Sequence, residues 1–378
     1  MKHKILRYTK RMLFIIAILF GVLLLTAIVF INFSPQFGGT PDKEQKKIYS
    51  QSDNFEDGKF IIRTPISTSE NRWEAIQKVF KKKTHQRPLK EIEPLVLDST
   101  AITSYSSDET KVTWFGHSTF LLQMQGATIL LDPMLGDYAS PLPINMTKRF
   151  NTKLPIAIEK LPFIDFVIFS HDHYDHLDYS TIKKIKDNVG KFFVPLGLSA
   201  HLTSWGVEKE KIEELDWWDM TSFGDIQLVC TPAIHFSGRG LFDQGATLWA
   251  SWVIKGKNDK IYFSGDSGYG NHFKTIGDKY GPFDLVLMEC GQYDKDWKNI
   301  HMFPEETVQA AVDVKGEVLV PIHWGSFKLA NHIWTDPIER VVKKAQELNI
   351  NISTPRIGET IIIHHKTYPE TRWWVNYD

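Results

Sequence analysis

The hydrophobic and polar positions divide the chain into three stretches. Residues 12–33 form an apolar run without a charged residue, and a polar stretch broken by proline and glycine follows up to residue 107. From residue 111 onward, short apolar runs alternate with longer amphipathic ones, which is the pattern of strands alternating with helices. The pattern predicts an apolar helix, a tether at 34–107 with a helical lead-in at 72–80, and a folded domain at 108–378.

The domain is expected to contain ten strands and five helices. The expected strands are 111–115, 120–124, 128–131, 166–169, 192–195, 226–230, 248–254, 260–264, 285–288 and 318–321. Several expected helices begin at capping or helix-first residues, and they are 179–187, 199–205, 269–279, 304–314 and 337–347. Strands at hairpin spacing come first and mixed units follow, so we expect an α/β fold of two sheets with helices outside.

The apolar run at 12–33 is long enough to cross a membrane. Its 22 residues would form a helix of about 33 Å, close to the hydrocarbon thickness of a bilayer. A cleaved signal peptide, the alternative, would have a shorter apolar core and a small-x-small cleavage site. Segment 1–11 is rich in Lys and Arg, and the next basic residue is Lys43. We therefore expect a single-pass anchor in the cell membrane, a cytoplasmic amino terminus and an extracytoplasmic domain.

Composition and charge add few constraints. With 42% hydrophobic and 24% charged residues, the chain has the composition of a globular protein. The formal net charge of -1 gives no global excess that would attract nucleic acid, so no such partner is expected. Cys230 and Cys290 are expected to be buried free thiols, with one disulfide as the alternative.

The strongest chemical signal is the run His171-Asp172-His173-Tyr174-Asp175-His176. It follows the strand expected at 166–169, so these side chains lie on a loop at the carboxyl end of a strand. Alternate residues of an extended loop point to the same side, which lets His171 and His173 converge on one ion. Asp175 and His176 can then serve a second ion, and imidazole and carboxylate suit zinc. A histidine-rich polar loop without metal is the alternative.

Two ions need more ligands than this loop supplies. Three further candidates directly follow other expected strands or lie close behind them, and they are His235, Asp266 and His323. Because the first loop also follows a strand, these side chains are expected to meet it at one edge of the fold.

The order HxHxDH, then His, Asp and His resembles the metallo-β-lactamase-fold hydrolase superfamily. Four motifs are similar to the branch that contains N-acylphosphatidylethanolamine-hydrolysing phospholipase D and its bacterial relatives. They are Trp-Phe-Gly-His-Ser at 114–118, Leu-Asp-Pro at 131–133, Ser-Gly-Asp-Ser-Gly-Tyr at 264–269 and His-Met-Phe-Pro-Glu-Glu at 301–306. The resemblance covers residues 112–358 and implies a four-layered αββα sandwich with the metals at one edge.

The resemblance also implies a complete ligand set for two Zn²⁺ ions. The first ion would be held by His171, His173 and His235, the second by Asp175, His176 and His323, and both would be bridged by Asp266. Asp175 and Asp266 would thereby take part in catalysis, in which a water held between the ions loses a proton and attacks. The implied reaction is hydrolysis without a covalent protein intermediate.

Four residues outside this set are further candidates. His117 and Asp132 would orient ligand imidazoles from behind, or serve as ordinary turn or core residues. His301 would assist the substrate phosphate or the leaving group, or simply lie at a helix entry. Arg239 could pair with a substrate phosphate, with a surface turn as the alternative.

The leading functional hypothesis is a membrane-anchored zinc phosphodiesterase of phospholipase D type that acts on N-acylphosphatidylethanolamine-like lipids. A lactonase or carboxylic-ester hydrolase on the same pair of metals is a second hypothesis, because the ions also polarise a carbonyl group. A non-enzymatic envelope factor is a third. The expected partners are a phospholipid or other amphiphilic ester and the membrane.

Overall fold

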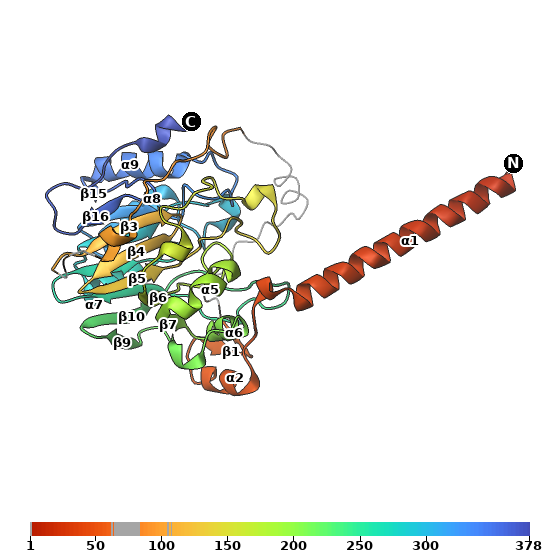
Figure 1. Cartoon of the computed structure of the whole chain (residues 1–378), viewed down its shortest axis with the longest axis horizontal. Coiled ribbons are helices and arrows are strands. Elements are labelled where there is room, and N and C mark those ends of the chain that lie inside the picture. The colour runs from red at the N-terminus through yellow and green to blue at the C-terminus, as the bar shows by residue number, and fades with distance from the viewer. Residues whose placement is uncertain (1, 62, 64–83, 104–105, 107) are drawn as a thin grey trace.

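The computed structural model describes residues 2–61, 63, 84–103, 106 and 108–378. Two seven-stranded sheets form the domain, and Figure 1 shows them stacked with helices around them. The first sheet contains β3 (Lys111–Gly116), β4 (Thr119–Met124), β5 (Ala127–Leu131), β6 (Ile164–Ile168), β7 (Val189–Pro195), β8 (Ile212–Leu215) and β16 (Thr360–Ile362). The second contains β9 (Met220–Phe223), β10 (Ile226–Thr231), β11 (Ser251–Lys255), β12 (Lys260–Phe263), β13 (Leu285–Glu289), β14 (Val318–Ile322) and β15 (Asn351–Ile352).

The strand order is β16-β3-β4-β5-β6-β7-β8 in the first sheet and β15-β14-β13-β12-β11-β10-β9 in the second. In each sheet an antiparallel half continues into a parallel half, which begins at the β5–β6 pair and at the β12–β13 pair. The helices outside the sheets are α5 (Tyr179–Ile185), α6 (Ser199–Ser204), α7 (His272–Tyr280), α8 (Pro304–Asp313) and α9 (Asp336–Leu348). A short helix, α4 (Ser99–Thr103), precedes the first sheet.

Side-chain alternation along the strands separates two buried cores. Phe120 and Ile129 of the first sheet share one cluster with Trp252 of the second sheet. Leu121, which follows Phe120 in β4 and points to the opposite face of the sheet, packs in another cluster with Ile182 of α5. One face of the first sheet therefore packs against the second sheet and the other against helices, while α8 contacts β13 and β14. The predicted αββα sandwich is confirmed.

The ten expected strands correspond to the ten inner strands of the two sheets. The four strands of these two sheets that the pattern did not predict are β8, β9, β15 and β16, and each lies at an edge of its sheet. Edge strands are short and often polar, so their apolar runs are weak. The expected strand 248–254 begins three residues later as β11, because Leu248 already bonds to Leu196 of another loop.

The amino-terminal helix α1 (Lys2–Phe33) projects away from the domain (Figure 1). Within its segment Ile5–Phe33, an apolar window of 18 residues has a mean hydropathy of 3.2, and none of that window is buried in the protein. A long, apolar and largely exposed helix is consistent with a transmembrane helix.

The described part of the expected tether packs on the domain. It contains α2 (Lys43–Tyr49), β1 (Phe55–Glu56) and β2 (Lys59–Phe60). The Tyr49 hydroxyl donates to Glu214 at 2.7 Å, and the indole of Trp205 donates to the carbonyl of Pro35 at 2.7 Å. The helical lead-in expected at 72–80 lies outside the described residues. Cys230 and Cys290 are buried free thiols, as expected.

Candidate metal centre

The seven expected ligands meet at one edge of the sandwich. His171, the first of the loop ligands, follows the carboxyl end of β6. His235 follows β10, Asp266 follows β12 and His323 follows β14. Within the second sheet β12 and β14 run parallel, so their carboxyl ends share one edge. The end of β6 lies at that edge too, because Nε2 of His171 is 3.8 Å from Asp266 Oδ2 and the His171 ring is 4.8 Å from the His235 ring between centroids. The topology therefore brings together side chains that are separated by up to about 150 positions.

Three imidazoles form the first ligand group. The Nδ1 atom of His173 lies 3.0 Å from Nε2 of His171 and 3.1 Å from Nε2 of His235. His171 and His235 are buried. These three ligand nitrogens lie within 4.8 Å of one another, and together they form a donor set that could hold one metal ion.

The second ligand group combines imidazoles with a carboxylate. Asp175 Oδ2 lies 3.0 Å from Nε2 of His323 and 3.4 Å from Nε2 of His176. These three residues also belong to one cluster whose possible ligand atoms lie within 4.8 Å of one another. The group is thus a second candidate metal site beside the first.

Asp266 connects the two groups. Its Oδ2 atom lies 3.0 Å from Nε2 of His323 and 3.2 Å from Nε2 of His176 in the second group. The same atom lies 3.8 Å from Nε2 of both His171 and His235 in the first group. Asp266 Oδ1 and His176 Nε2 are buried, and neither has a hydrogen-bond partner among the described residues. Buried polar atoms without partners fit a site built for metal ions.

Partners behind the imidazoles set which nitrogen is available as a ligand. Nδ1 of His176 lies 2.7 Å from Asp132 Oδ2, and Nδ1 of His235 lies 3.0 Å from the carbonyl of Ile300. Nδ1 of His323 lies 3.2 Å from the carbonyl of Gly291. Because these oxygens accept hydrogen bonds from Nδ1–H groups, the Nε2 lone pairs are left to face the centre.

The electrostatics of the site differ between its two halves. Burial and neighbouring imidazoles lower the pKa of His171 and of His235, which keeps both in the neutral form that binds a metal. Burial would also lower the pKa of His323, but the carboxylates of Asp266 and Asp175 raise it to about 10. These carboxylates favour positive charge between them, which a divalent cation can supply in place of a proton.

His117 and Asp132 lie behind the ligands. Nε2 of His117 is 2.8 Å from Asp175 Oδ2, and both His117 and Asp132 are fully buried. Asp132 also accepts hydrogen bonds from the backbone N–H and the hydroxyl of Ser170. His117, Asp132 and His323 have φ angles of 54°, 38° and 66°, a left-handed conformation that non-glycine residues adopt only when their surroundings hold them.

His301 lies beside the first ligand group, and its partner was missed by the sequence analysis. Nδ1 of His301 shares a hydrogen bond with Oε1 of Glu289, a fully buried carboxylate at the end of β13. Glu289 also accepts from the backbone N–H of Ser267 at 2.9 Å. Burial raises the pKa of Glu289. An acidic residue ending an apolar strand at the ligand edge was the signal that could have identified it.

Arg239 does not face the centre as a free phosphate contact. Its buried guanidinium donates to the backbone carbonyls of Asp172, Leu177 and Gln36. It also lies over the ring of Tyr174, 4.0 Å from the centroid. The expectation that Arg239 binds substrate is therefore corrected: the side chain ties the histidine-rich loop to the segment that follows α1.

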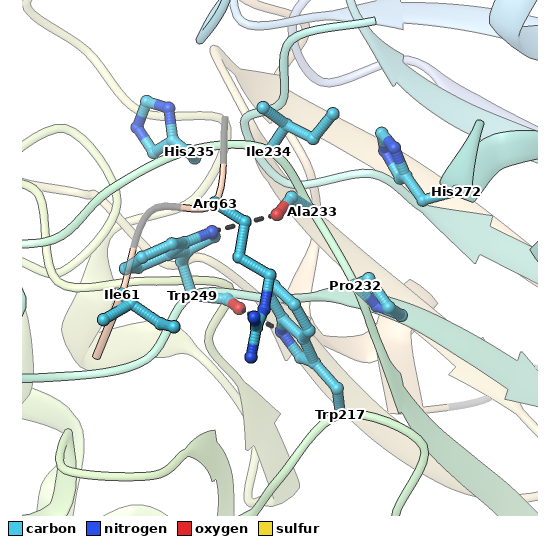
Figure 2. A pocket seen from close by; sticks show the side chains of 9 residues that line it. All are labelled: Ile61, Arg63, Trp217, Pro232, Ala233, Ile234, His235, Trp249 and His272. Carbon is cyan, nitrogen blue, oxygen red and sulfur yellow. Dashed lines mark hydrogen bonds between the residues drawn. The ribbon is translucent and has the colours of Figure 1, made fainter. Parts of the chain in front are cut away.

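A cavity of about 170 Å³ adjoins the backbone of residues 232–235. Figure 2 shows Arg63 extending between the indoles of Trp249 and Trp217, while the imidazole of His235 points away from the Arg63 guanidinium. The two indoles donate to the carbonyls of Ala233 and Trp249 at 2.9 and 2.7 Å. The indole of Trp249, which lines the cavity, therefore holds the segment that carries His235 from behind.

Known proteins are similar to this chain in sequence and in fold. The family described as the β-lactamase superfamily domain matches residues 127–324. An uncharacterised protein of Mycobacterium tuberculosis is 40% identical over 321 residues, covering 84% of this chain and 86% of that protein. N-acyl-phosphatidylethanolamine-hydrolyzing phospholipase D 1 of Caenorhabditis elegans is 37% identical over 254 residues, covering 62% of this chain and 71% of that protein. The metallo hydrolase Igni18 of Ignicoccus hospitalis has a TM-score of 0.52 and 23% identity, covering 68% of this chain and 100% of its own.

The fold and the histidine-aspartate centre define a metal-dependent hydrolase. The chain belongs to the β-lactamase superfamily, in its branch of metallo-β-lactamase-fold hydrolases. Its sequence is similar to N-acyl-phosphatidylethanolamine-hydrolyzing phospholipase D 1.

Proposed function

We propose that the protein is a membrane-anchored dinuclear zinc phosphodiesterase of phospholipase D type, acting on lipids similar to N-acylphosphatidylethanolamine. The observation that carries the proposal is the position of Asp266, whose Oδ2 atom lies within 3.8 Å of ligand atoms in both groups. The 37% identical relative named for this reaction supports the substrate class.

The ligand groups suit two zinc ions. In this proposal His171, His173 and His235 hold one ion, Asp175, His176 and His323 hold the other, and Asp266 bridges them. A pair of divalent ions, when bound, lowers the pKa of the water that they hold to near neutrality and offsets negative charge on a phosphoryl oxygen. The phosphodiester would lie in front of the ligand atoms, where it can reach both groups.

His301 is positioned to handle the proton of the leaving group. Ligand-type atoms of His301, His235 and Asp266 lie within 4.8 Å of one another, so the imidazole reaches the space next to the first ligand group. Glu289 accepts the hydrogen bond from Nδ1 of His301. The doubly protonated imidazole would then give its Nε2 proton to the departing alcohol oxygen and remain as the neutral Nδ1–H form. Asp175 and Asp266 then act through the metals, and His301 acts on the substrate.

The anchoring of the domain follows from α1. The apolar segment Ile5–Phe33 spans the bilayer in this proposal, with the basic segment 1–11 in the cytoplasm and the domain on the outer side. Protease added to sealed spheroplasts should digest the domain while a reporter fused before residue 1 stays protected. Protection of the domain would reverse the topology, and release of the protein by alkaline carbonate would refute the anchor.

The experiment on substrate class uses the full chain, purified in detergent and loaded with zinc. Bis(p-nitrophenyl) phosphate, N-acylphosphatidylethanolamine and an acyl-homoserine lactone are compared in one assay series. Turnover of both phosphodiesters, lost in Asp266→Asn and kept in the exposed-site control His364→Gln, is the expected result. Turnover of the lactone alone would favour the lactonase alternative, and no turnover of any substrate would favour a non-enzymatic envelope role.

A further inference from the structure

Large apolar side chains are exposed in two loops of the domain. The loop between β10 and β11 carries Leu241 and Phe242, which are 70% and 88% exposed. The loop between β5 and β6 carries Leu142, Ile144 and Met146, which are 48%, 42% and 46% exposed. Exposed apolar groups gathered in this way mark a surface that meets an apolar partner.

The first loop lies beside the end of α1. Gln36 follows Phe33, the last residue of α1, by three positions. The carbonyl of Gln36 accepts two hydrogen bonds from the guanidinium of Arg239, at 3.0 and 2.8 Å. Phe242 follows Arg239 by three positions, so the backbones of the two residues are at most about 10 Å apart. The tip of this loop is therefore next to the point where α1 enters the domain.

The second loop lies beside the same point. Gln36 lines a surface cavity together with Pro141 and Pro143, which flank Leu142 in the sequence. Figure 1 shows the yellow loop after β5 on the side of the domain from which α1 departs. Both loops with exposed apolar side chains thus flank one exit point.

The charges at the two loops favour lipid chains over a charged partner. Residues 140–147 contain no charged side chain. Asp243, next to Phe242, turns its carboxylate back onto the backbone N–H groups of Arg239 and Gly240, at 3.1 and 2.8 Å. The loop tips therefore present apolar side chains outward while the nearest carboxylate is satisfied by the backbone.

The histidine-rich loop lies directly on this part of the protein. The ring of Tyr174 contacts Phe37 edge-on, with 6.5 Å between the ring centroids. The Tyr174 hydroxyl donates to the carbonyl of Arg239 at 2.8 Å. The segment that follows the apolar helix, the exposed loop and the candidate metal loop are therefore in direct contact.

From these contacts we infer that Leu241, Phe242 and the apolar side chains of residues 142–146 insert into the leaflet from which α1 emerges. The inference rests on the proposed anchoring by α1 and adds a second contact that orients the domain. Apolar tips at the level of the headgroups hold a protein on a bilayer by burying a few large side chains. The metal centre then faces the lipid surface, so that a phospholipid reaches it without leaving the leaflet.

Depth-sensitive labelling of the full chain tests the inference. Leu142→Cys and Phe242→Cys are each labelled with an environment-sensitive fluorophore and reconstituted in phosphatidylcholine vesicles. Cys230 and Cys290 are buried, so they need not be replaced. Leu348→Cys, an exposed apolar position at the end of α9, is the matched control. Flotation of the vesicles reports independently whether α1 anchors the protein.

The expected result is a blue-shifted emission at positions 142 and 242, quenched at least about threefold more by headgroup-region spin-labelled lipid than the emission at position 348. Adding anionic lipid should change this difference little. Water-like emission at 142 and 242 in co-floating protein overturns the inference while leaving the anchor intact. Shielding that occurs only in native membranes, and not in pure lipid, also overturns it, because the loops would then dock on a protein. Loss of co-flotation would instead refute the anchor.

Discussion

Asp132 Oδ2 lies 2.7 Å from Nδ1 of His176, and both side chains are fully buried. The same carboxylate receives the backbone N–H and the hydroxyl of Ser170, the residue before His171. One carboxylate at the end of β5 therefore orients a candidate ligand from each of the two ligand groups. Such carboxylates behind a histidine ligand fix its tautomer and raise its basicity.

Replacing Asp132 should weaken metal binding. In Asp132→Asn the amide no longer carries the charge that favours a proton on Nδ1 of His176, so zinc affinity should fall about 10- to 100-fold. Competition with a fluorescent chelator measures this change. The control Asp187→Asn removes an exposed carboxylate and should leave the affinity unchanged. Equal affinity in Asp132→Asn and wild type would show that Asp132 has no role in orienting the ligands.

Replacing Arg239 should affect stability more than substrate binding. Arg239→Met leaves the carbonyls of Asp172, Leu177 and Gln36 without their donor, which should lower the free energy of unfolding by about 2–4 kcal/mol. The KM for bis(p-nitrophenyl) phosphate should change less than about threefold. Unfolding in urea and steady-state kinetics test both parts, with the exposed Arg372→Met as the control. A large rise in KM with unchanged stability would restore the substrate-binding interpretation.

The His301–Glu289 pair should act on turnover rather than on metal content. His301→Gln should lower kcat by about 10²- to 10⁴-fold because the leaving oxygen loses its proton donor. Glu289→Gln should give a smaller loss, and the double variant should be no worse than His301→Gln alone, since Glu289 acts through His301. Zinc content should remain at the wild-type value in all three. Additive losses, or loss of zinc in His301→Gln, would contradict these roles.

Acid should destabilise the protein partly through His117. Burial and the neighbouring His323 lower the pKa of His117 to about 3, whereas it is about 6.5 in an unfolded chain. Between pH 3 and 6.5, His117 is largely protonated in the unfolded chain and neutral in the folded chain. The free energy of unfolding therefore falls as the pH falls, by about 1.4 kcal/mol per pH unit from this residue.

His117→Asn keeps a donor for Asp175 but cannot be protonated in this range. Between pH 6.5 and 5, wild type should lose about 2 kcal/mol more stability than His117→Asn, measured by urea unfolding at saturating zinc. Parallel losses in the two proteins would show that His117 does not remain neutral when folded.

Much of the fold was predictable because its inner strands are buried on both faces. Runs such as Leu285–Glu289 are continuously apolar over the first four residues, and that pattern is strong even without partners in view. The edge strand β8 reads Ile-Glu-Glu-Leu and carries no such signal. Its assignment depends on pairing with β7, which only the folded chain reveals.

The candidate ligands could be proposed from the sequence because they lie in short His- and Asp-containing motifs. The contacts of Arg239 could not be predicted in this way. One acceptor of Arg239 is the carbonyl of Gln36, 203 positions away. Every residue has a backbone carbonyl, so a sequence cannot show which carbonyls will accept hydrogen bonds from Arg239. The residues next to Arg239 therefore suggested only a substrate anion as its partner. Glu289 was missed for a related reason, since its importance arises from His301 reaching back to it across the fold.

The number of zinc ions bound per chain tests the central claim most directly. Mass-spectrometric metal analysis of the full-length protein, after removal of loosely bound metal, should give two zinc ions per chain. Asp266→Ala removes the carboxylate that both ligand groups share, and it should reduce this number. A value of one or less in the wild-type protein would contradict a dinuclear centre.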